Sequence, residues 1–195
     1  MKFKAFIDDA MNKIAARGGT IVDMGGGERF QKWLEPYEPL FANADYKSFD
    51  YDASTKPDIV GDIHHIPLQN NSVDSIICAS VLEHIHNPIV AAQELHRVIK
   101  PGGYLFVYVP SIYPYHARKG HYPDYWRFFD DTLFLILENF SDIKIEKRGG
   151  YFYALSFFIP RQHKIRKFLD AVTGWLDTVL KSNSTTAGYY VIAQK

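Results

Sequence analysis

Three histidines stand where proton-transfer chemistry could take place. His84 follows the apolar run 73–82, and His116 and His121 lie in a Pro- and Tyr-rich stretch at 110–126. The ordinary pKa of histidine suits proton transfer near neutral pH, so each could act as a general base. We take the three as candidate catalytic residues. The alternative for each is a purely structural role.

A second group of residues suits the binding of a nucleotide-sized cofactor. The β-branched and apolar run 20–24 contains Asp23 and passes straight into Gly25, Gly26 and Gly27. Residues without Cβ permit positive φ and let a ligand approach the backbone closely. Open α/β sheets bind ligands at the carboxyl edge, so we expect Asp23 and the glycines beside the cofactor. A tight turn without a ligand is the alternative.

The position of the last glycine separates two classes of cofactor. A dinucleotide-binding fingerprint, G-x-G-x-x-G, that began at Gly25 would need its last glycine at position 30, where the chain has Phe30. This mismatch disfavours a nicotinamide dinucleotide. An NAD-dependent oxidoreductase is therefore the less favoured alternative.

Apolar β-rich runs alternate with helical patterns along the first 110 residues, which is typical of βαβ units and a parallel sheet. Strands are predicted at 20–24, about 46–50, 58–61, 74–80 and 104–109. Helices are predicted at 5–17, 28–42 and 88–99. A parallel sheet places the carboxyl ends of its strands along one edge. Further candidates for binding a cofactor stand at or just after these ends: Asp50, Tyr51, Asp62, Ile63, Ala79 and Ser80.

Residues 110–128 are expected to form a loop on the substrate side of the sheet. Aromatic walls for a planar or apolar acceptor are offered by Tyr113, Tyr115 and Tyr125. Arg127 offers a clamp for an anion. The alternative is that Arg127 pairs with Asp124, three residues earlier, and organises the start of a helix.

The C-terminal part contains a helical insertion. A helical pattern at 129–139 precedes strands at 142–147 and 188–193, and the insertion at 151–183 separates those strands. It combines an apolar helix face with four basic residues, Arg161, Lys164, Arg166 and Lys167. We favour a helix that covers the substrate pocket or the sheet. A homodimer face and peripheral membrane contact through 151–180 are the alternatives.

Composition limits the partners and the setting of the protein. The 195 residues are expected to form a single domain, and 22 Lys and Arg balance 22 Asp and Glu. A neutral chain has no overall field to attract nucleic acid, so none is expected. Cys78 is the only cysteine, which excludes an internal disulfide and favours a cytoplasmic setting. No tight cluster of ligands is visible in the sequence, so no metal is expected.

The glycine turn resembles the first motif of the class I S-adenosylmethionine-dependent methyltransferases, an acid, any residue, then G-x-G-x-G. Asp23, Gly25 and Gly27 match this motif, and Arg29 stands where the last glycine is expected. Segments 61–67 and 73–84 also resemble the family. The run 95–103 is similar to the R-V-L-K-P-G-G turn of the branch that includes quinone-biosynthesis methyltransferases.

The resemblance implies a fold, a cofactor and roles for residues. The implied fold is a three-layer, Rossmann-like α/β sheet of seven mostly parallel strands, with helices on both faces and an antiparallel last strand between the fifth and sixth. The cofactor would be S-adenosylmethionine and the product S-adenosylhomocysteine. Asp50 would accept the ribose hydroxyls, Asp62 the adenine amino group, and Ile63 would pack on the ring. The expected activity is methyl transfer to a small-molecule acceptor. A non-catalytic cofactor-binding module is the alternative.

Overall fold

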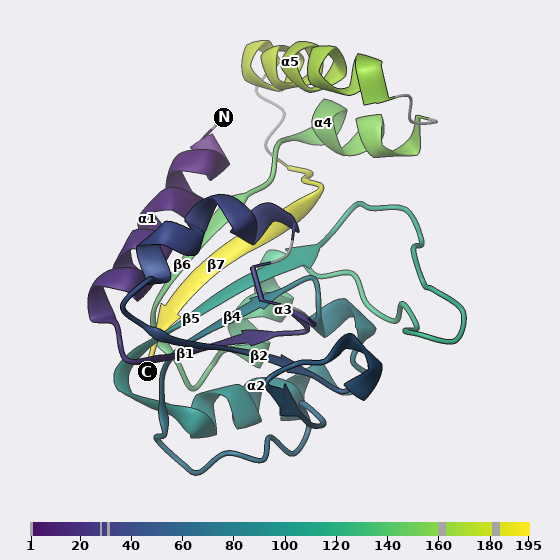
Figure 1. The fold of residues 1–195 in the computed structure, drawn as a ribbon. Helices are drawn as coiled ribbons and strands as arrows, with labels where there is room; N and C mark the ends of the chain where they lie inside the picture. Colours follow the sequence, from purple (N-terminus) through teal and green to yellow (C-terminus); the bar gives the residue numbers. More distant parts are fainter. Residues whose placement is uncertain (1, 28, 31, 160–162, 181–183) are drawn as a thin grey trace.

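The computed structural model describes residues 2–27, 29–30, 32–159, 163–180 and 184–195 (Figure 1). Seven strands form one sheet in the order β3-β2-β1-β4-β5-β7-β6. The strands are β1 (Thr20–Met24), β2 (Asp45–Asp50), β3 (Ile59–Val60), β4 (Val73–Ala79), β5 (Ile99–Pro110), β6 (Ser141–Lys147) and β7 (Gly188–Gln194). Neighbouring strands among β1–β5 pair in parallel, whereas β7 runs antiparallel to both β5 and β6. The predicted topology, including the inserted last strand, is confirmed.

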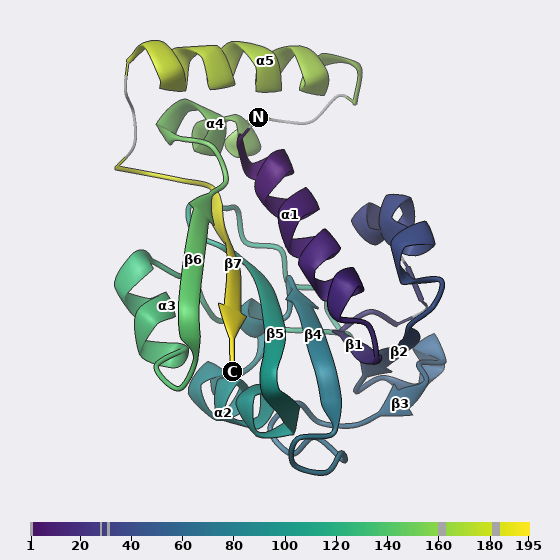
Figure 2. The same ribbon diagram turned by 90° about the vertical axis from the view of Figure 1, so that its left-hand side faces the viewer.

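Helices cover both faces of this sheet, as Figure 2 shows. One face carries α1 (Lys2–Arg17) and the 3₁₀ helix η1 (Lys32–Phe41), and the other carries α2 (Pro88–Val98) and α3 (Asp130–Ile136). The α1 side chains that pack on the sheet recur every three or four residues, at Ile7, Ala10, Met11 and Ile14. On the opposite face, α2 buries Ala91, Ala92, Leu95 and Val98. The Asn87 side chain caps α2 by accepting the Val90 N–H at 3.3 Å.

Two elements differ from the sequence-based expectation. The helix predicted at 28–42 is a 3₁₀ helix that begins at Lys32, and it contains Pro36 and Pro39. Proline lacks the N–H that an α-helix interior needs. The fifth strand begins at Ile99 rather than near residue 104, because Ile99 pairs with Val73 and the Pro-Gly-Gly segment forms an irregularity within the strand, with Gly102 at φ of +73°. A Cβ on Gly103 would lie 2.5 Å from the Asp74 carbonyl oxygen, so only glycine lets the two backbones approach this closely.

The insertion forms α4 (Tyr151–Leu155), η4 (Ser156–Phe158) and α5 (His163–Val179). Figures 1 and 2 show α5 lying over α4, on the side away from the sheet. The α5 helix turns a polar side chain inward, because Asp177 accepts the N–H groups of Gly150, Phe152 and Tyr153 at 2.9, 2.8 and 3.1 Å. Phe168 and Val179, which belong to the predicted apolar face, are exposed.

The α5 helix therefore packs on α4 rather than directly over the sheet or the pocket expected for the insertion. The basic residues of the sequence-based membrane hypothesis fall at 161–167, where Arg161 and the side chains of Lys164, Arg166 and Lys167 lie outside the described part. None of the helices in the described part of the chain is long and apolar enough to span a bilayer.

Candidate active site

The carboxyl ends of β1, β2, β4 and β5 open onto a cavity of about 900 Å³. This edge is where open α/β sheets bind ligands. The loop 110–128 forms the far wall, and its backbone is tied to the sheet where Tyr125 N–H donates to the Glu83 carbonyl at 2.8 Å. Most of the sequence-predicted residues line the cavity: Gly25, Gly26, Gly27, Asp50, Tyr51, Asp62, Ile63, Ala79, Ser80, His84, Tyr113, His116, His121 and Tyr125.

The glycine turn after β1 leaves no room for side chains. Gly25 has φ of +70°, and a Cβ there would lie 2.6 Å from a methyl carbon of Val81. A Cβ on Gly26 would lie 2.4 Å from a carboxylate oxygen of Asp23. The turn thus exposes its backbone to the cavity, as a cofactor that approaches the main chain requires.

Asp23 lies beneath this turn and does not line the cavity, although the sequence places it beside the cofactor. It is 4% exposed, and its carboxylate accepts the Tyr46 hydroxyl at 2.9 Å. Burial raises the pKa of Asp23 to about 7, the Tyr46 hydrogen bond opposes this rise, and the charge of Asp50 adds to it. Asp23 therefore supports the turn from the protein interior.

Arg29, the departure from the methyltransferase glycine motif, points away from the cavity. Its guanidinium makes two hydrogen bonds to the Asp58 carboxylate, at 2.8 and 2.7 Å. This pairing is the main reason that the pKa of Asp58 falls to about 2. Asp58 also accepts the Ser48 N–H at 2.8 Å, which ties the segment before β3 to β2. Arg29 does not line the cavity.

Two acids stand on the cavity wall with capacity to accept further hydrogen bonds. Asp50 accepts the Asp52 N–H on one oxygen at 3.0 Å, and its other oxygen has no partner within the described residues. Asp62 accepts the His64 N–H at 2.9 Å, and its side chain is 65% exposed. Ile63, the residue after Asp62, also lines the cavity and is 5% exposed. Two carboxylates and an apolar side chain are therefore available for the ribose and base of a nucleoside.

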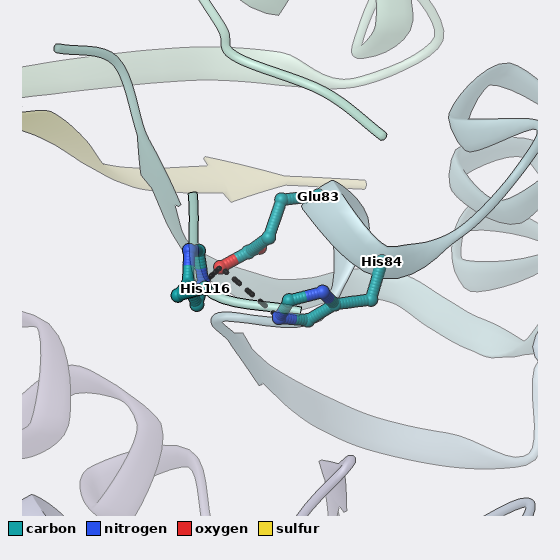
Figure 3. Close-up of side chains that lie close together, drawn as sticks. All are labelled: Glu83, His84 and His116. Carbon is teal, nitrogen blue, oxygen red and sulfur yellow. Dashed lines mark ion pairs between the residues drawn. The ribbon is translucent and has the colours of Figure 1, made fainter. Parts of the chain in front are cut away.

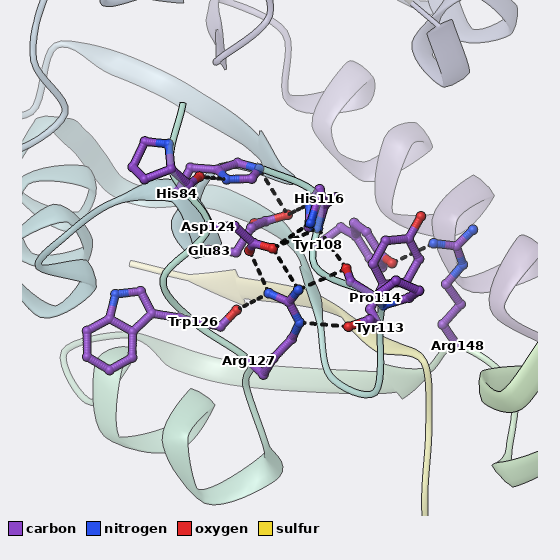
Figure 4. A network of polar contacts seen from close by, with 11 residues as sticks. Glu83, His84, Tyr108, Tyr113, Pro114, His116, Asp124, Trp126, Arg127 and Arg148 are labelled. Carbon is purple, nitrogen blue, oxygen red and sulfur yellow. Dashed lines mark hydrogen bonds and ion pairs between the residues drawn. The ribbon is translucent and has the colours of Figure 1, made fainter. Parts of the chain in front are cut away.

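Arg127 does not act as the anion clamp that the sequence suggested, because its donors are taken by the protein. It binds both carboxylate oxygens of Asp124, at 2.6 and 2.8 Å, and donates to the carbonyls of Tyr113 and Pro114 (Figure 4). The Asp124 side chain is fully buried. The pairing of Arg127 with Asp124 matches the alternative stated for it, but the pair holds a loop and does not start a helix. Tyr115 also lies off the cavity wall and is 77% exposed.

Two of the three candidate histidines meet a buried carboxylate on the cavity wall (Figure 3). The Nε2 atoms of His84 and His116 both lie 3.8 Å from Oε1 of Glu83. Glu83 is 1% exposed. Interaction with Glu83 raises the pKa of His116 most, burial opposes the rise, and Asp124 adds to it. His121 lines the cavity outside this cluster.

Known proteins share sequence and fold with this chain. Residues 26–107 match a family model described as a methyltransferase domain. A methyltransferase structure from Archaeoglobus fulgidus, described as S-adenosylmethionine-dependent, aligns over 99% of each chain with a TM-score of 0.61 and 15% identity. Phosphoethanolamine N-methyltransferase 2 of Haemonchus contortus, in complex with S-adenosylmethionine, covers 96% of this chain and 52% of its own, with a TM-score of 0.56 and 15% identity.

The curated relatives match a shorter segment. The ubiquinone/menaquinone biosynthesis C-methyltransferase UbiE of Coxiella burnetii is 39% identical over 49 residues, which are 25% of this chain and 20% of the relative. Residues 26–107 are thus similar to a methyltransferase domain, and the fold is that of solved S-adenosylmethionine-dependent methyltransferases. The matched segments span only 15% to 24% of the length of the first curated relatives.

The cavity wall also holds Glu83 and Arg148, which are not among the sequence-predicted site residues. Glu83 forms the centre of the histidine cluster, and its place in the Leu-Glu-His exit of β4 is a signal that could have identified it. Arg148 follows β6 and lines the cavity. Its guanidinium lies 5.1 Å from the ring centre of Tyr108 and 5.2 Å from that of Phe157. No local motif marks Arg148, because only the pairing of β6 with β7 brings it to this wall.

Proposed function

We propose that this chain transfers the methyl group of S-adenosylmethionine to a small-molecule acceptor and releases S-adenosylhomocysteine. The observation that carries this proposal is the cavity, because the glycine turn, Asp50 and Asp62 line the same hollow as the loop 110–128. A sulfonium methyl is already electrophilic. The protein therefore has to align the acceptor with the carbon–sulfur bond and exclude water.

The cofactor-binding residues are those that line the sheet side of the cavity. The unpartnered oxygen of Asp50 would accept a ribose hydroxyl, and Asp62 would accept the adenine amino group. Ile63 and Tyr51 would pack against the nucleoside, and Ala79 and Ser80 would border it. The backbone of the turn at 25–27 would face the methionine end, where only glycine leaves space.

The acceptor would lie between this cofactor and the loop 110–128. Tyr113 and Tyr125 supply aromatic walls. Arg148 donates to the Tyr108 hydroxyl, forms no ion pair with a carboxylate among the described residues, and has a buried Nε without a hydrogen-bond partner. A half-buried guanidinium without a carboxylate partner favours an acceptor that carries a carboxylate or a phosphate. His84, His116 and His121 are the groups on the wall that could receive a proton from the acceptor.

Isothermal titration calorimetry tests the cofactor assignment. We expect the wild-type protein to bind S-adenosylmethionine and S-adenosylhomocysteine, and Asp50→Ala to weaken both at least tenfold. Asp45→Asn is the matched control, because Asp45 stands at the opposite end of β2. Binding of NADH without binding of either sulfur nucleoside would contradict the proposal and favour an oxidoreductase.

Transfer of a labelled methyl group from S-adenosylmethionine to a pool of metabolites tests the activity. We expect labelled acidic small molecules to appear with the wild-type protein and to be absent with Asp50→Ala. Cofactor binding without any transfer across that pool would instead identify a non-catalytic cofactor-binding module.

A further inference from the structure

We propose that Glu83, His84 and His116 bind a divalent transition-metal cation on the cavity wall, a site independent of whether methyl transfer occurs. Their nearest ligand atoms, one from each side chain, all lie within 4.8 Å of one another. Oε1 of Glu83 is 3.8 Å from Nε2 of each histidine. Ligands about 2.1 Å from a metal ion stand slightly closer together than this, so a small inward movement of the side chains completes the site.

The two imidazole rings are held with the correct nitrogen turned toward the centre of the cluster. Nδ1 of His84 contacts the carbonyl oxygen of Pro123. Nδ1 of His116 lies 3.2 Å from the carbonyl oxygen of Pro114 and 3.1 Å from the Asp124 carboxylate. A carbonyl oxygen can only accept, so Nδ1 of each ring carries the hydrogen. In the neutral ring, this leaves the lone pair on Nε2.

Metal-binding histidines ordinarily make the same kind of contacts through Nδ1. Such a ring donates its other N–H to a carbonyl or a carboxylate, which fixes its tautomer and its orientation. Asp124 is itself held by two hydrogen bonds from Arg127, so the orientation of His116 is supported by a second layer of contacts. Arg127 and Asp124 would thus act as positioning residues for the metal site.

The carboxylate at the centre needs a cation. Glu83 is 1% exposed, and its Oε2 has no hydrogen-bond partner among the described residues. Its recorded ion-pair partners there are the two histidines, which carry a positive charge only when they are protonated. A buried carboxylate oxygen without a hydrogen-bond partner is costly, and a metal ion between the three groups offsets that cost.

The donor set indicates the class of metal. Two imidazole nitrogens and one carboxylate oxygen suit Zn²⁺, Fe²⁺, Co²⁺ or Mn²⁺, whereas Mg²⁺ and Ca²⁺ prefer oxygen alone. Three protein ligands leave coordination positions open toward the cavity, where water or a donor atom of the acceptor would bind. The Nε2 lone pairs of His84 and His116 would then be occupied by the metal. His121 would be the histidine left free to receive a proton.

Metal titration of the chelator-treated protein tests this site. We expect calorimetry to give one Zn²⁺ per chain, with affinity reduced at least tenfold in both Glu83→Gln and His116→Asn. His65→Ala is the matched control, because His65 is exposed and does not line the cavity. No stoichiometric binding of Zn²⁺ or Co²⁺, or binding that survives both substitutions, would overturn the proposal.

Two measurements keep the result interpretable. Binding of S-adenosylhomocysteine is measured separately and reports whether each variant is folded. A protein that binds S-adenosylhomocysteine but no metal would contradict the metal site and leave the proposed function intact. Nitrogen NMR of labelled histidine in the wild-type protein needs no variant. Zn²⁺ should shift Nε2 of two rings whose Nδ1 stays protonated, and unchanged signals at saturating Zn²⁺ would count against the site.

Discussion

At the scale of single residues, the partner of a side chain determines its role more than its type. Arg127 and Arg148 lie on or near the same cavity, yet Arg127 is bound to Asp124 and two carbonyl groups. Arg148 donates to the Tyr108 hydroxyl and has no carboxylate partner among the described residues. A guanidinium with a buried carboxylate supports the structure, whereas one without a counter-ion is available to a ligand.

This difference predicts opposite effects of two arginine substitutions. Arg148→Gln should raise KM for an anionic acceptor about tenfold or more, because one charge-assisted contact is lost. The melting temperature should change little. Arg127→Gln should lower the melting temperature by several degrees, because it leaves the buried Asp124 carboxylate without its counter-ion. Steady-state kinetics and thermal unfolding of both variants check this pair of outcomes. Equal effects in the two variants would contradict the roles assigned.

Asp23 should make stability depend on pH. Its pKa rises from 3.8 to about 7 on folding, mainly through burial. In the folded state this carboxyl group keeps its proton to a higher pH than in the unfolded state. Below the unfolded pKa of 3.8 the group is protonated in both states, so it does not destabilise the folded protein. The free energy of unfolding then falls between about pH 4 and 7.

Asp23→Asn is neutral throughout this range and should lose that part of the pH dependence. Urea unfolding at several pH values would measure it, with the variant gaining stability relative to wild type as the pH rises toward 7. The amide oxygen of the variant side chain can still accept the Tyr46 hydroxyl, so the comparison isolates the charge. Parallel profiles for the two proteins would argue against a shifted pKa.

At the scale of elements, the backbone path after β1 matters more than the side chains of the motif. Gly25 and Gly120 both have positive φ, +70° and +80°, but a Cβ on Gly25 meets Val81 at 2.6 Å and one on Gly120 meets nothing within 4 Å. The two positions share the backbone strain of a left-handed residue and differ in the steric clash. They therefore form a matched pair.

We expect Gly25→Ala to weaken S-adenosylhomocysteine binding at least tenfold and Gly120→Ala to leave it within about twofold, because only the first Cβ intrudes beside the cofactor wall. Calorimetry on the folded variants measures both. Similar affinities for the two variants would show that the turn at 25–27 does not require an open backbone.

At the scale of the whole molecule, the cofactor should stabilise the fold as a unit. The cavity joins the ends of four parallel strands with the loop 110–128, so a ligand there contacts elements from most of the described sheet. At a concentration of one hundred times Kd, a ligand adds about 2.7 kcal/mol to the free energy of unfolding. For a domain of this size, that corresponds to a rise of roughly 5–10 °C in the melting temperature.

Differential scanning fluorimetry with S-adenosylhomocysteine should show this rise for the wild-type protein and for Asp45→Asn, and a much smaller one for Asp50→Ala. The rise should increase with ligand concentration, as binding to the folded state alone requires. A constant melting temperature across that range would speak against the proposed cofactor.

The sequence by itself determined the sheet and the edge at which the cavity opens. Local backbone structure is reflected in the alternating strand and helix patterns, in the glycines at 25–27 and in the acids at 50 and 62. Such features can be recognised from short segments of the sequence. Tertiary structure alone decided the side-chain partnerships. The pairing of Arg127 with Asp124 was one of two alternatives that the sequence left open, and the fold decided between them. The fold also brings Glu83 and His116 together and carries Arg148 to the cavity wall. Such pairings depend on how loops and strands distant in sequence pack against one another, and no local pattern encodes that packing.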